Sequence, residues 1–337
     1  MQKKQKKIIK TTLAAEKSSE DKKEELLRPQ TLDEYIGQTS NKEALRIAIN
    51  SAKKRNTTID HILLYGPPGL GKTTLSYILA NEMGASIKYM SGPAIEKPGD
   101  IVGILSSLGE NDFLFIDEIH RMNKSAEEIL YSAMEDNFIT ITIGKENAQA
   151  RQIKLSLPKF TLVGATTRAG MLSSPLRDRF GIHCKMEYYN EDELKRIIKR
   201  TSNLIDLDID DISAEILSKC SRGTPRIANR NVNRIRDYCV AYNTVCNENT
   251  TKEALSIYGI NENGLNNVDM QILKTLFLQQ NKPMGLDTLS CVIGEDPETL
   301  ETVYEPYLLK TGFIQKTPRG RIITPYAVEN VLQCEVR

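Results

Sequence analysis

The hydrophobic positions in the first half of the chain alternate between short apolar runs and longer segments with a helical pattern. Four runs have the length of strands, and they are residues 62–65 (ILLY), 86–90 (SIKYM), 113–116 (FLFI) and 160–163 (FTLV). Strands that alternate with helices are typical of a parallel sheet covered by helices. The pattern therefore predicts an α/β domain with a parallel sheet.

Beyond Tyr189 the pattern becomes wholly helical. Leu194, Ile197 and Ile198 have the spacing of one helical face. The helical stretch ends at the polar, glycine-bearing residues 261–267, which have the composition of a linker. We expect a small all-helical domain between these points.

The remaining chain predicts three helices followed by a hairpin. The helices are expected around residues 272–277, 286–293 and 300–308. Two short strands, residues 313–316 and 321–324, flank a Thr-Pro-Arg-Gly turn with basic side chains. Helices followed by a basic hairpin suggest a winged helix.

These patterns divide the chain into four segments. They are a polar tail (1–25), a large α/β P-loop domain (26–189), a small helical lid domain (190–260) and a winged-helix head domain (261–337). The start of the tail is Lys-rich but lacks the apolar core of a signal peptide. The tail is therefore predicted to be disordered, with a DNA-touching arm as the alternative.

The overall composition fits a soluble globular protein, with 40% hydrophobic and 26% charged residues. No apolar run approaches the ~18 residues that span a bilayer, so we expect no membrane contact. The formal net charge is +1, so any contact with DNA must be local. Six cysteines without a CxxC pair, with only three histidines, disfavour a zinc site and favour the reduced thiols of a cytoplasmic protein.

The strongest chemical signal is a glycine-rich loop directly after the ILLY strand. Residues 66–73 (GPPGLGKT) match the P-loop pattern GxxxxGK[ST], and a helical pattern follows them. The N–H groups of such a loop surround phosphates, and the helix N-terminus adds positive potential. Lys72 is expected to reach the β- and γ-phosphates of ATP, and the Thr73 hydroxyl is expected to bind Mg²⁺.

A second signal lies where the FLFI strand ends in two acids. Asp117 and Glu118 follow it, in the pattern of a Walker B element. Asp117 is expected to hold the Mg²⁺ shell, and Glu118 is expected to polarise the attacking water. Many buried strands end in acids, so the pattern has this meaning only because it follows a P-loop.

Three further positions fit the same chemistry. Thr167 follows the FTLV strand and is expected to orient water and sense the γ-phosphate, although Thr-Thr after a strand is also an ordinary helix start. In the turn SPLRDRF an arginine is expected to reach the γ-phosphate of a neighbouring subunit, and we favour Arg179 over Arg177. Arg226, at a helix start in the lid, is expected to point at the nucleotide, with a solvated arginine as the alternative.

The order of these elements resembles the AAA+ superfamily, and seven longer strings resemble one family within it. They are LLRPQTLDEYIGQ (26–38), HILLYGPPGLGKTTL (61–75), FIDEIHRM (115–122), GATTRAG (164–170), SPLRDRFGI (174–182), RGTPRIANR (222–230) and GFIQKTPRGR (312–321). Together they resemble the RuvB family of bacterial Holliday-junction branch-migration motors. The combination of RGTPRIANR with a terminal TPRGR wing is the most specific part of the resemblance.

The resemblance implies an ATP-hydrolysing DNA motor of homologous recombination and DNA repair. It implies a homo-hexameric ring around duplex arms of Holliday junctions, with RuvA recognising the junction, RuvC resolving it, and ATP and Mg²⁺ as cofactors. The implied nucleotide contacts are Leu27, Arg28, Gly69, Lys72, Thr73, Thr74, Glu135, Asp136, Asn137, Arg179, Tyr189 and Arg226. The implied DNA contacts are Lys316 and Arg321, with Arg319 beside them in the wing.

Two strictly alternating segments predict an additional hairpin. Residues 138–143 (FITITI) and 153–157 (IKLSL) place six apolar side chains on one face. They are Ile139, Ile141, Ile143, Ile153, Leu155 and Leu157. This face either packs on the core of its own domain or forms an exposed patch for a partner. In the RuvB resemblance, the hairpin between Ile139 and Leu157 is where RuvA docks.

Two other functions are compatible with the nucleotide-binding motifs. One is a clamp-loader-like or initiator-like AAA+ nucleotide switch on DNA, and the other is a protein-remodelling AAA+ chaperone. The basic wing favours a DNA-binding protein over a chaperone. In addition, residues 91–100 lack the aromatic residue that the pore loop of a chaperone often carries.

Overall fold

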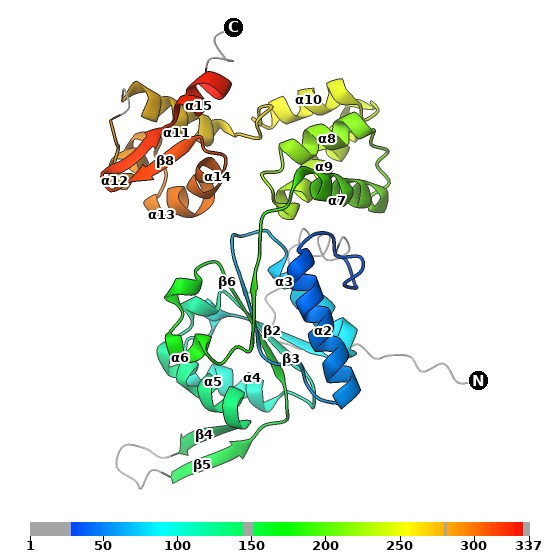
Figure 1. Ribbon diagram of the computed structural model, residues 1–337, viewed down its shortest axis with the longest axis vertical. Coiled ribbons are helices and arrows are strands. Elements are labelled where there is room, and N and C mark those ends of the chain that lie inside the picture. The colour runs from blue at the N-terminus through cyan, green and yellow to red at the C-terminus, as the bar shows by residue number, and fades with distance from the viewer. Residues whose placement is uncertain (1–27, 144–150, 280–281, 333–337) are drawn as a thin grey trace, which may run out of the picture.

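The computed structural model describes residues 28–143, 151–279 and 282–332. The predicted tail and Leu27 lie outside the described residues. In Figure 1 the large domain lies below, and the lid and the head lie next to each other above it. Within the described ranges, no helix has both the length and the apolar character that a membrane span requires.

The large domain is built around a five-stranded parallel sheet with the order β2-β3-β6-β1-β7. Its strands are β1 (Ile62–Tyr65), β2 (Ile87–Ser91), β3 (Phe113–Asp117), β6 (Thr161–Thr166) and β7 (Ile182–Lys185). The four apolar runs all form strands, which confirms that prediction. The sequence does not predict β7, because IHCK is short and only half apolar. It forms the edge of the sheet, with Ile182 opposite Ile62.

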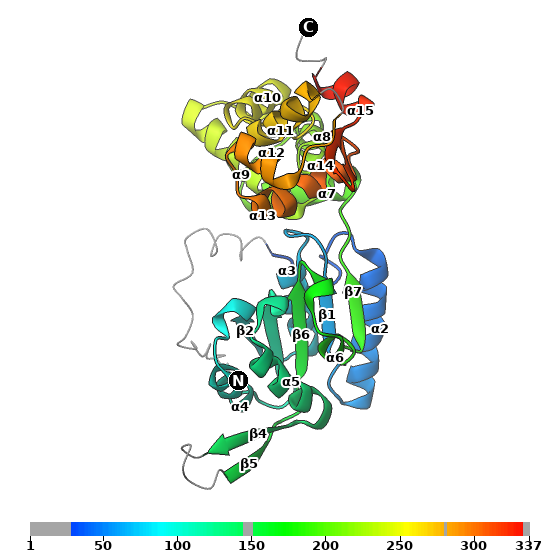
Figure 2. The same cartoon turned by 90° about the vertical axis from the view of Figure 1, so that its left-hand side faces the viewer.

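Helices cover both faces of this sheet. They are α2 (Thr39–Arg55), α3 (Lys72–Met83), α4 (Pro98–Ser106), α5 (Lys124–Asp136) and α6 (Ser174–Arg177), with the short turns η1 (Gly92–Ala94), η2 (Ile119–Arg121) and η3 (Ala169–Met171). Figure 2 shows α2 and α4 on opposite sides of the sheet. Successive strand residues point to opposite faces of the sheet. Leu64 therefore belongs to the hydrophobic cluster that includes α3, and Leu63 belongs to a second cluster that includes α5.

The predicted additional hairpin is confirmed, and it projects from the base of the large domain in Figure 1. Its strands are β4 (Phe138–Ile143) and β5 (Arg151–Ser156), and Ile139 pairs with Leu155. Its apolar face is divided between the two expected environments. Ile139 and Leu157 are buried in the domain core, whereas Ile153 and Leu155 are 49% and 37% exposed. The side chains of Ile141 and Ile143 lie outside the described residues.

The lid is wholly helical, as the periodicity predicts, and it consists of four helices. They are α7 (Glu191–Leu204), α8 (Asp211–Lys219), α9 (Pro225–Tyr242) and α10 (Glu248–Ile257). The side chains of Asn190 and Asp210 cap the first two helices by accepting hydrogen bonds from backbone N–H groups. Leu194, Ile198 and Val232 belong to the same buried cluster as Leu75 of the large domain, so the lid packs directly on it.

The head is a winged helix with its own hydrophobic core, which confirms the predicted fold class. Its elements are α11 (Asn267–Leu278), α12 (Leu286–Ile293), α13 (Pro297–Thr299), η4 (Leu300–Tyr304), α14 (Glu305–Lys310), β8 (Ile314–Thr317), β9 (Gly320–Ile323), α15 (Pro325–Ala327) and η5 (Val328–Leu332). The third predicted helix exists as the continuous run α13, η4 and α14. Its middle part has π-helical geometry, which the apolar spacing does not reveal.

Two ion pairs of different character join the head to the rest of the molecule. Arg222 of the lid contacts Asp269 of α11, and the two side chains are 11% and 0% exposed. The guanidinium of Arg222 also donates to Gly264 O at 2.8 Å. By contrast, Arg168 of the large domain lies 3.2 Å from the exposed Glu298 of the head. A buried pair is costly to break and an exposed one is not, so the head is joined more firmly to the lid.

Candidate nucleotide-binding and hydrolysis site

The P-loop connects β1 to α3 and has the backbone of a phosphate-binding loop. Gly66, Gly69 and Gly71 have φ values of 143°, 76° and 95°. A Cβ on Gly69 would lie 2.6 Å from Thr224 Cγ2, so the close approach of the lid requires glycine there. The N-terminus of α3 follows directly at Lys72, which places its free N–H groups at the loop.

Lys72 lies inside this loop and is 8% exposed. Its Nζ donates to Gly66 O and to Pro67 O, both at 2.8 Å. Burial lowers the pKa of Lys72 to about 8, and the carboxylates of Glu118 and Asp117 oppose this effect. A bound phosphate would add negative charge beside the ammonium and favour its protonated form.

The two acids of the Walker B element lie at the end of β3, and both line the pocket. Burial raises the pKa of Asp117, and a hydrogen bond from the N–H of Glu118 at 3.0 Å partly opposes that effect. Glu118 has a φ of 47°, which is uncommon for a residue with a long side chain. Backbone strain of this kind concentrates at functional sites, which supports the role predicted for Glu118.

The carboxylate of Glu118 is held by residues from two other elements. Thr167 Oγ1 donates to Glu118 Oε2 at 3.2 Å, and His120 Nδ1 lies 3.2 Å from the same oxygen. His120 Nδ1 is also 2.9 Å from Thr166 Oγ1. Thr167 and Glu118 are therefore brought together as the sequence predicts. The sequence pattern does not single out His120, although it lies two residues after Glu118.

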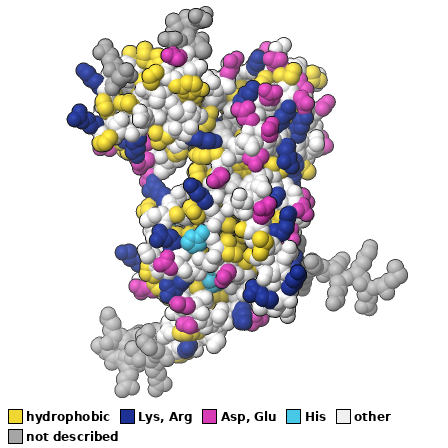
Figure 3. Space-filling view, viewed as in Figure 1, with side chains coloured by type: hydrophobic (Ala, Val, Ile, Leu, Met, Phe, Trp, Pro, Cys, Tyr) yellow, Lys and Arg dark blue, Asp and Glu magenta, His cyan; other side chains and the backbone are white. Residues whose placement is uncertain are grey.

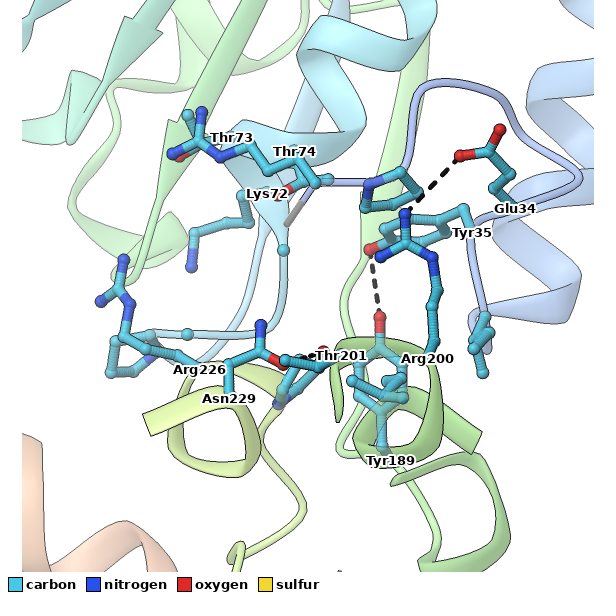
Figure 4. Close-up of a pocket in the computed structure, with 18 of the residues that line it drawn as sticks. Glu34, Tyr35, Lys72, Thr73, Thr74, Tyr189, Arg200, Thr201, Arg226 and Asn229 are labelled. Carbon is cyan, nitrogen blue, oxygen red and sulfur yellow. Dashed lines mark hydrogen bonds and ion pairs between the residues drawn. The ribbon is translucent and has the colours of Figure 1, made fainter. Parts of the chain in front are cut away.

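The lid forms the opposite wall of the pocket, which Figure 4 shows. The N–H of Arg226 donates to Gly69 O at 3.3 Å, and the side chain of Arg226 lines the pocket. Tyr189 Oη donates to Tyr35 Oη at 3.1 Å, where the lid begins. At the mouth, Arg200 Nη2 lies 3.7 Å from Glu34 Oε2. Nucleotide bound here would touch the large domain and the lid together.

Many predicted site residues line this one pocket. They are Arg28, Gly69, Lys72, Thr73, Thr74, Asp117, Glu118, Thr167, Tyr189 and Arg226. The structure adds side chains that the sequence analysis did not propose, and they are Pro29, Glu34, Tyr35, Ile36, Ile197, Arg200, Thr201 and Asn229. Ile197, Arg200 and Thr201 share the i, i+3, i+4 spacing of one helix face. That spacing was a signal, but it does not say which domain the face meets.

Another group of predicted residues lies away from this pocket. Glu135, Asp136 and Asn137 end α5, and Arg179 follows α6; none of them lines the pocket. Arg179 Nη2 is 2.7 Å from Glu135 Oε2. Arg179 and Glu135 therefore form a second cluster on the same domain, apart from the pocket.

The oxygen donors at the pocket fit Mg²⁺. Thr73 offers a hydroxyl and Asp117 a carboxylate, and both line the pocket. Mg²⁺ prefers oxygen ligands and usually keeps phosphate oxygens and waters in its shell. In the part of the chain that the structure describes, no group of three or more His, Cys, Asp or Glu side chains could hold a metal ion. An ion that is held jointly by nucleotide and protein suits this site.

The wing places its three predicted DNA contacts in different environments. Arg319 is exposed at the turn, and Lys316 is exposed with its Nζ 3.0 Å from Glu301 Oε1. Arg321 is only 6% exposed, and it donates to both carboxylate oxygens of Glu305 at 2.5 and 3.0 Å. Arg321 therefore points into the head, although the resemblance implies that it contacts DNA together with Lys316. Glu305 is itself buried and draws the guanidinium into the head.

A P-loop pocket at the end of a parallel sheet, closed by a helical lid, defines a P-loop AAA+ ATPase. In this chain a winged helix follows the lid. Three domain families match the chain in succession. They are described as the Holliday junction DNA helicase RuvB P-loop domain (residues 27–186), the RuvB AAA lid domain (189–261) and the RuvB C-terminal winged helix domain (262–332). The chain belongs to the RuvB family.

Individual relatives agree with this assignment over nearly the whole length. A protein of Fusobacterium nucleatum, named Holliday junction branch migration complex subunit RuvB, is 53% identical over 313 residues, which cover 92% of this chain and 94% of the relative. The solved structure of the Thermotoga maritima RuvB Holliday junction branch migration motor is 46% identical, with a TM-score of 0.81, and covers 91% of this chain and 98% of its own. The solved structure of a mutant of that protein has the same identity and a TM-score of 0.82. The match covers 90% of this chain and 98% of the mutant chain.

Proposed function

We propose that this protein is an ATP-driven motor that moves the branch point of Holliday junctions in recombination and repair. It acts in the cytoplasm as a homo-hexameric ring around duplex DNA, together with RuvA and RuvC. Membership of the RuvB family supports this role, because the relatives described above are named for it.

The observation that carries the proposal is the double role of one lid segment. Arg226 lines the nucleotide pocket, and Arg222, four residues earlier in the turn before α9, contacts Asp269 of the head. A change of lid angle on binding or release of ATP therefore moves the DNA-binding head with it. A motor needs such a connection between its nucleotide site and its DNA contact.

The chemistry assigned to the pocket is phosphoryl transfer to water. Lys72 and the P-loop N–H groups bind the phosphates, and Thr73 and Asp117 hold Mg²⁺, which when bound neutralises phosphate charge. Glu118 polarises the attacking water, and Thr167 orients it. Arg179 of one subunit reaches the γ-phosphate in its neighbour, where it stabilises the charge of the transition state.

The direct test is dissociation of a synthetic four-way junction by this protein with RuvA and ATP. We expect the junction to separate into duplex products only when ATP can be hydrolysed. A nucleotide switch would hydrolyse ATP on DNA and leave the junction intact. Hydrolysis without junction movement, with ring assembly confirmed, would therefore overturn the motor proposal.

The exposed end of the β4–β5 hairpin is proposed as the docking surface for RuvA. Ile153 and Leu155 share one strand face and are both exposed, whereas the other end of that face is fixed in the core. Apolar side chains at the end of a projecting, anchored hairpin suit a partner that buries them.

Leu155→Asp should weaken RuvA binding on the order of a hundredfold, because a buried contact is replaced by a charge that must be desolvated. Basal ATPase activity and melting temperature should stay near the parent values, since Leu155 is 37% exposed. Ser156→Asp is the matched control, because it adds the same charge on the opposite face of β5. Equal loss of binding in both variants would indicate a charge effect rather than docking.

DNA contact is proposed for Arg319 and Lys316 of the wing, through phosphates rather than bases. Over the face shown in Figure 3, Lys and Arg side chains are interspersed with Asp and Glu, so binding must depend on local groups. Lys316 is paired with the exposed Glu301, a contact that a phosphate can replace. A motor must pass any sequence, which base readout would prevent.

Arg319→Ala should weaken binding to unrelated duplexes to a similar degree and flatten the log–log salt dependence by about one unit. Arg321→Ala should instead lower the stability of the head by roughly 3–5 kcal/mol, because it leaves Glu305 buried and unpaired. Salt titrations on two duplexes, with thermal melts of both variants, check these expectations. Lys219→Ala, which removes an exposed charge from the lid, is the control. A duplex preference that disappears in Arg319→Ala would instead indicate base readout.

A further inference from the structure

Arg179 rests on the aromatic ring of Tyr131, a residue of α5 with no role assigned so far. Its Cζ lies 4.7 Å from the ring centroid. Its Nη1 donates to Pro175 O at 2.7 Å, and its Nη2 meets Glu135 Oε2 at 2.7 Å. Its Nε is buried and has no hydrogen-bond partner among the described residues. The guanidinium thus lies over the ring, and its two terminal nitrogens make the polar contacts.

The ring of Tyr131 is itself fixed. Its hydroxyl donates to Glu127 Oε1 at 2.9 Å and lies 3.0 Å from Ser173 Oγ. Ser173 caps α6 by accepting from the N–H of Leu176 at 3.3 Å. The phenol therefore ties α5 to the N-cap of α6, the short helix that Arg179 follows, and the ring and the arginine keep their relative position.

The carboxylate at the edge of the guanidinium is held less firmly than the ring. The side chain of Glu135 is 62% exposed, whereas that of Arg179 is 26% exposed. Exposed ion pairs contribute little stability, so another anion can replace Glu135. A phosphate that replaced Glu135 at Nη2 would leave the contact with the ring undisturbed, because the ring lies next to Cζ.

We propose that Tyr131 is a positioning residue for Arg179 in trans. Its ring holds the guanidinium in place while Nη2 of Arg179 exchanges Glu135 for the γ-phosphate of the nucleotide that the neighbouring subunit binds. An arginine side chain has many rotamers. Contact with a fixed aromatic ring restricts Arg179 to few of them before it contacts the phosphate. This inference rests on the proposed role of Arg179.

Mixed rings test the proposal separately from the rest of the site. Recipient subunits carry Arg179→Ala, so their pockets are intact but they offer no arginine. Donor subunits carry Lys72→Ala, so only their Arg179 contributes to hydrolysis. Donors that also carry Tyr131→Leu should restore roughly tenfold less ATPase activity in kcat, with little change in KM for ATP. Donors with Tyr131→Phe, which keep the ring and lose only the hydroxyl contacts, should restore clearly more activity than donors with Tyr131→Leu.

The donor pocket is already inactive, so damage to it by the Tyr131 change cannot explain a lower kcat. Ring assembly and melting temperature are measured for every donor, and Tyr131→Met, which fills the volume without an aromatic face, replaces Tyr131→Leu if the latter does not assemble. Equal rescue by donors with and without the ring would overturn the role of Tyr131 and leave the trans role of Arg179 intact. If donors with the native tyrosine fail to rescue at all, the trans role of Arg179 fails, and this inference falls with it.

Discussion

Rings built from Glu118→Gln subunits should bind ATP almost as tightly as the parent and hydrolyse it at least about a hundredfold more slowly. The amide keeps the size of the side chain and its contact with Thr167, which lies 3.2 Å away in the parent. It cannot polarise water as the carboxylate does. Because the P-loop and Lys72 are untouched, the phosphate cradle remains. Nucleotide binding by fluorescence and single-turnover hydrolysis measure the two properties separately.

Two comparisons make this result specific. Lys72→Ala should lose affinity for ATP itself, because it removes the buried ammonium from the phosphate site. Glu110→Gln removes an exposed carboxylate from the turn before β3 and should behave as the parent. Hydrolysis at the parent rate by Glu118→Gln would mean that another group polarises the water, and His120 would be the first to examine.

Arg179→Ala subunits should form rings that bind ATP but hydrolyse it on the order of a thousandfold more slowly, which is the effect expected of a trans-acting arginine. Mixing them with Lys72→Ala subunits should restore activity. In an equal, random mixture about one interface in four joins an intact pocket to an intact arginine, since each ring interface is head to tail. ATPase activity against mixing ratio, with ring assembly confirmed, is the measurement.

Arg177→Ala is the matched control, because it removes the same charge from the same turn. Arg177 is exposed, whereas Arg179 lies on Tyr131 and meets Glu135. Mixtures that remain inactive at every ratio would contradict a trans role for Arg179. Loss of activity in Arg177→Ala that Lys72→Ala subunits rescue would transfer that role to Arg177.

The nucleotide pocket was predictable from sequence because its motifs are local. A P-loop needs its glycines, Lys72 and Thr73 within a few residues, and the strand and helix around it have clear patterns. Asp117 and Glu118 likewise follow directly from the end of β3. By contrast, Tyr35, Arg200 and Asn229 line the same pocket from distant segments. No local pattern indicates that these segments converge.

In the wing and in the β4–β5 hairpin, local pattern likewise predicts the strands but not the surroundings of their side chains. Turn residues and alternation correctly predicted both pairs of strands. The environment of each side chain depends on what packs against the hairpin. Arg321 turns inward because buried Glu305 lies beside it, and Glu305 is 16 residues away in sequence. Ile139 is buried and Leu155 exposed, although both have the same place in the alternating pattern.

The sequence by itself determined most strands and helices, though not β7, together with the three-domain organisation and the residues of the P-loop and Walker B element, because each depends on periodicity or short spacing. Tertiary structure decided which basic side chains of the wing are exposed, where the lid meets the pocket and which residues contact Arg179. Those features arise from contacts between residues far apart in the chain, such as Arg222 with Asp269. The energy of such contacts depends on burial, which only the packed molecule defines.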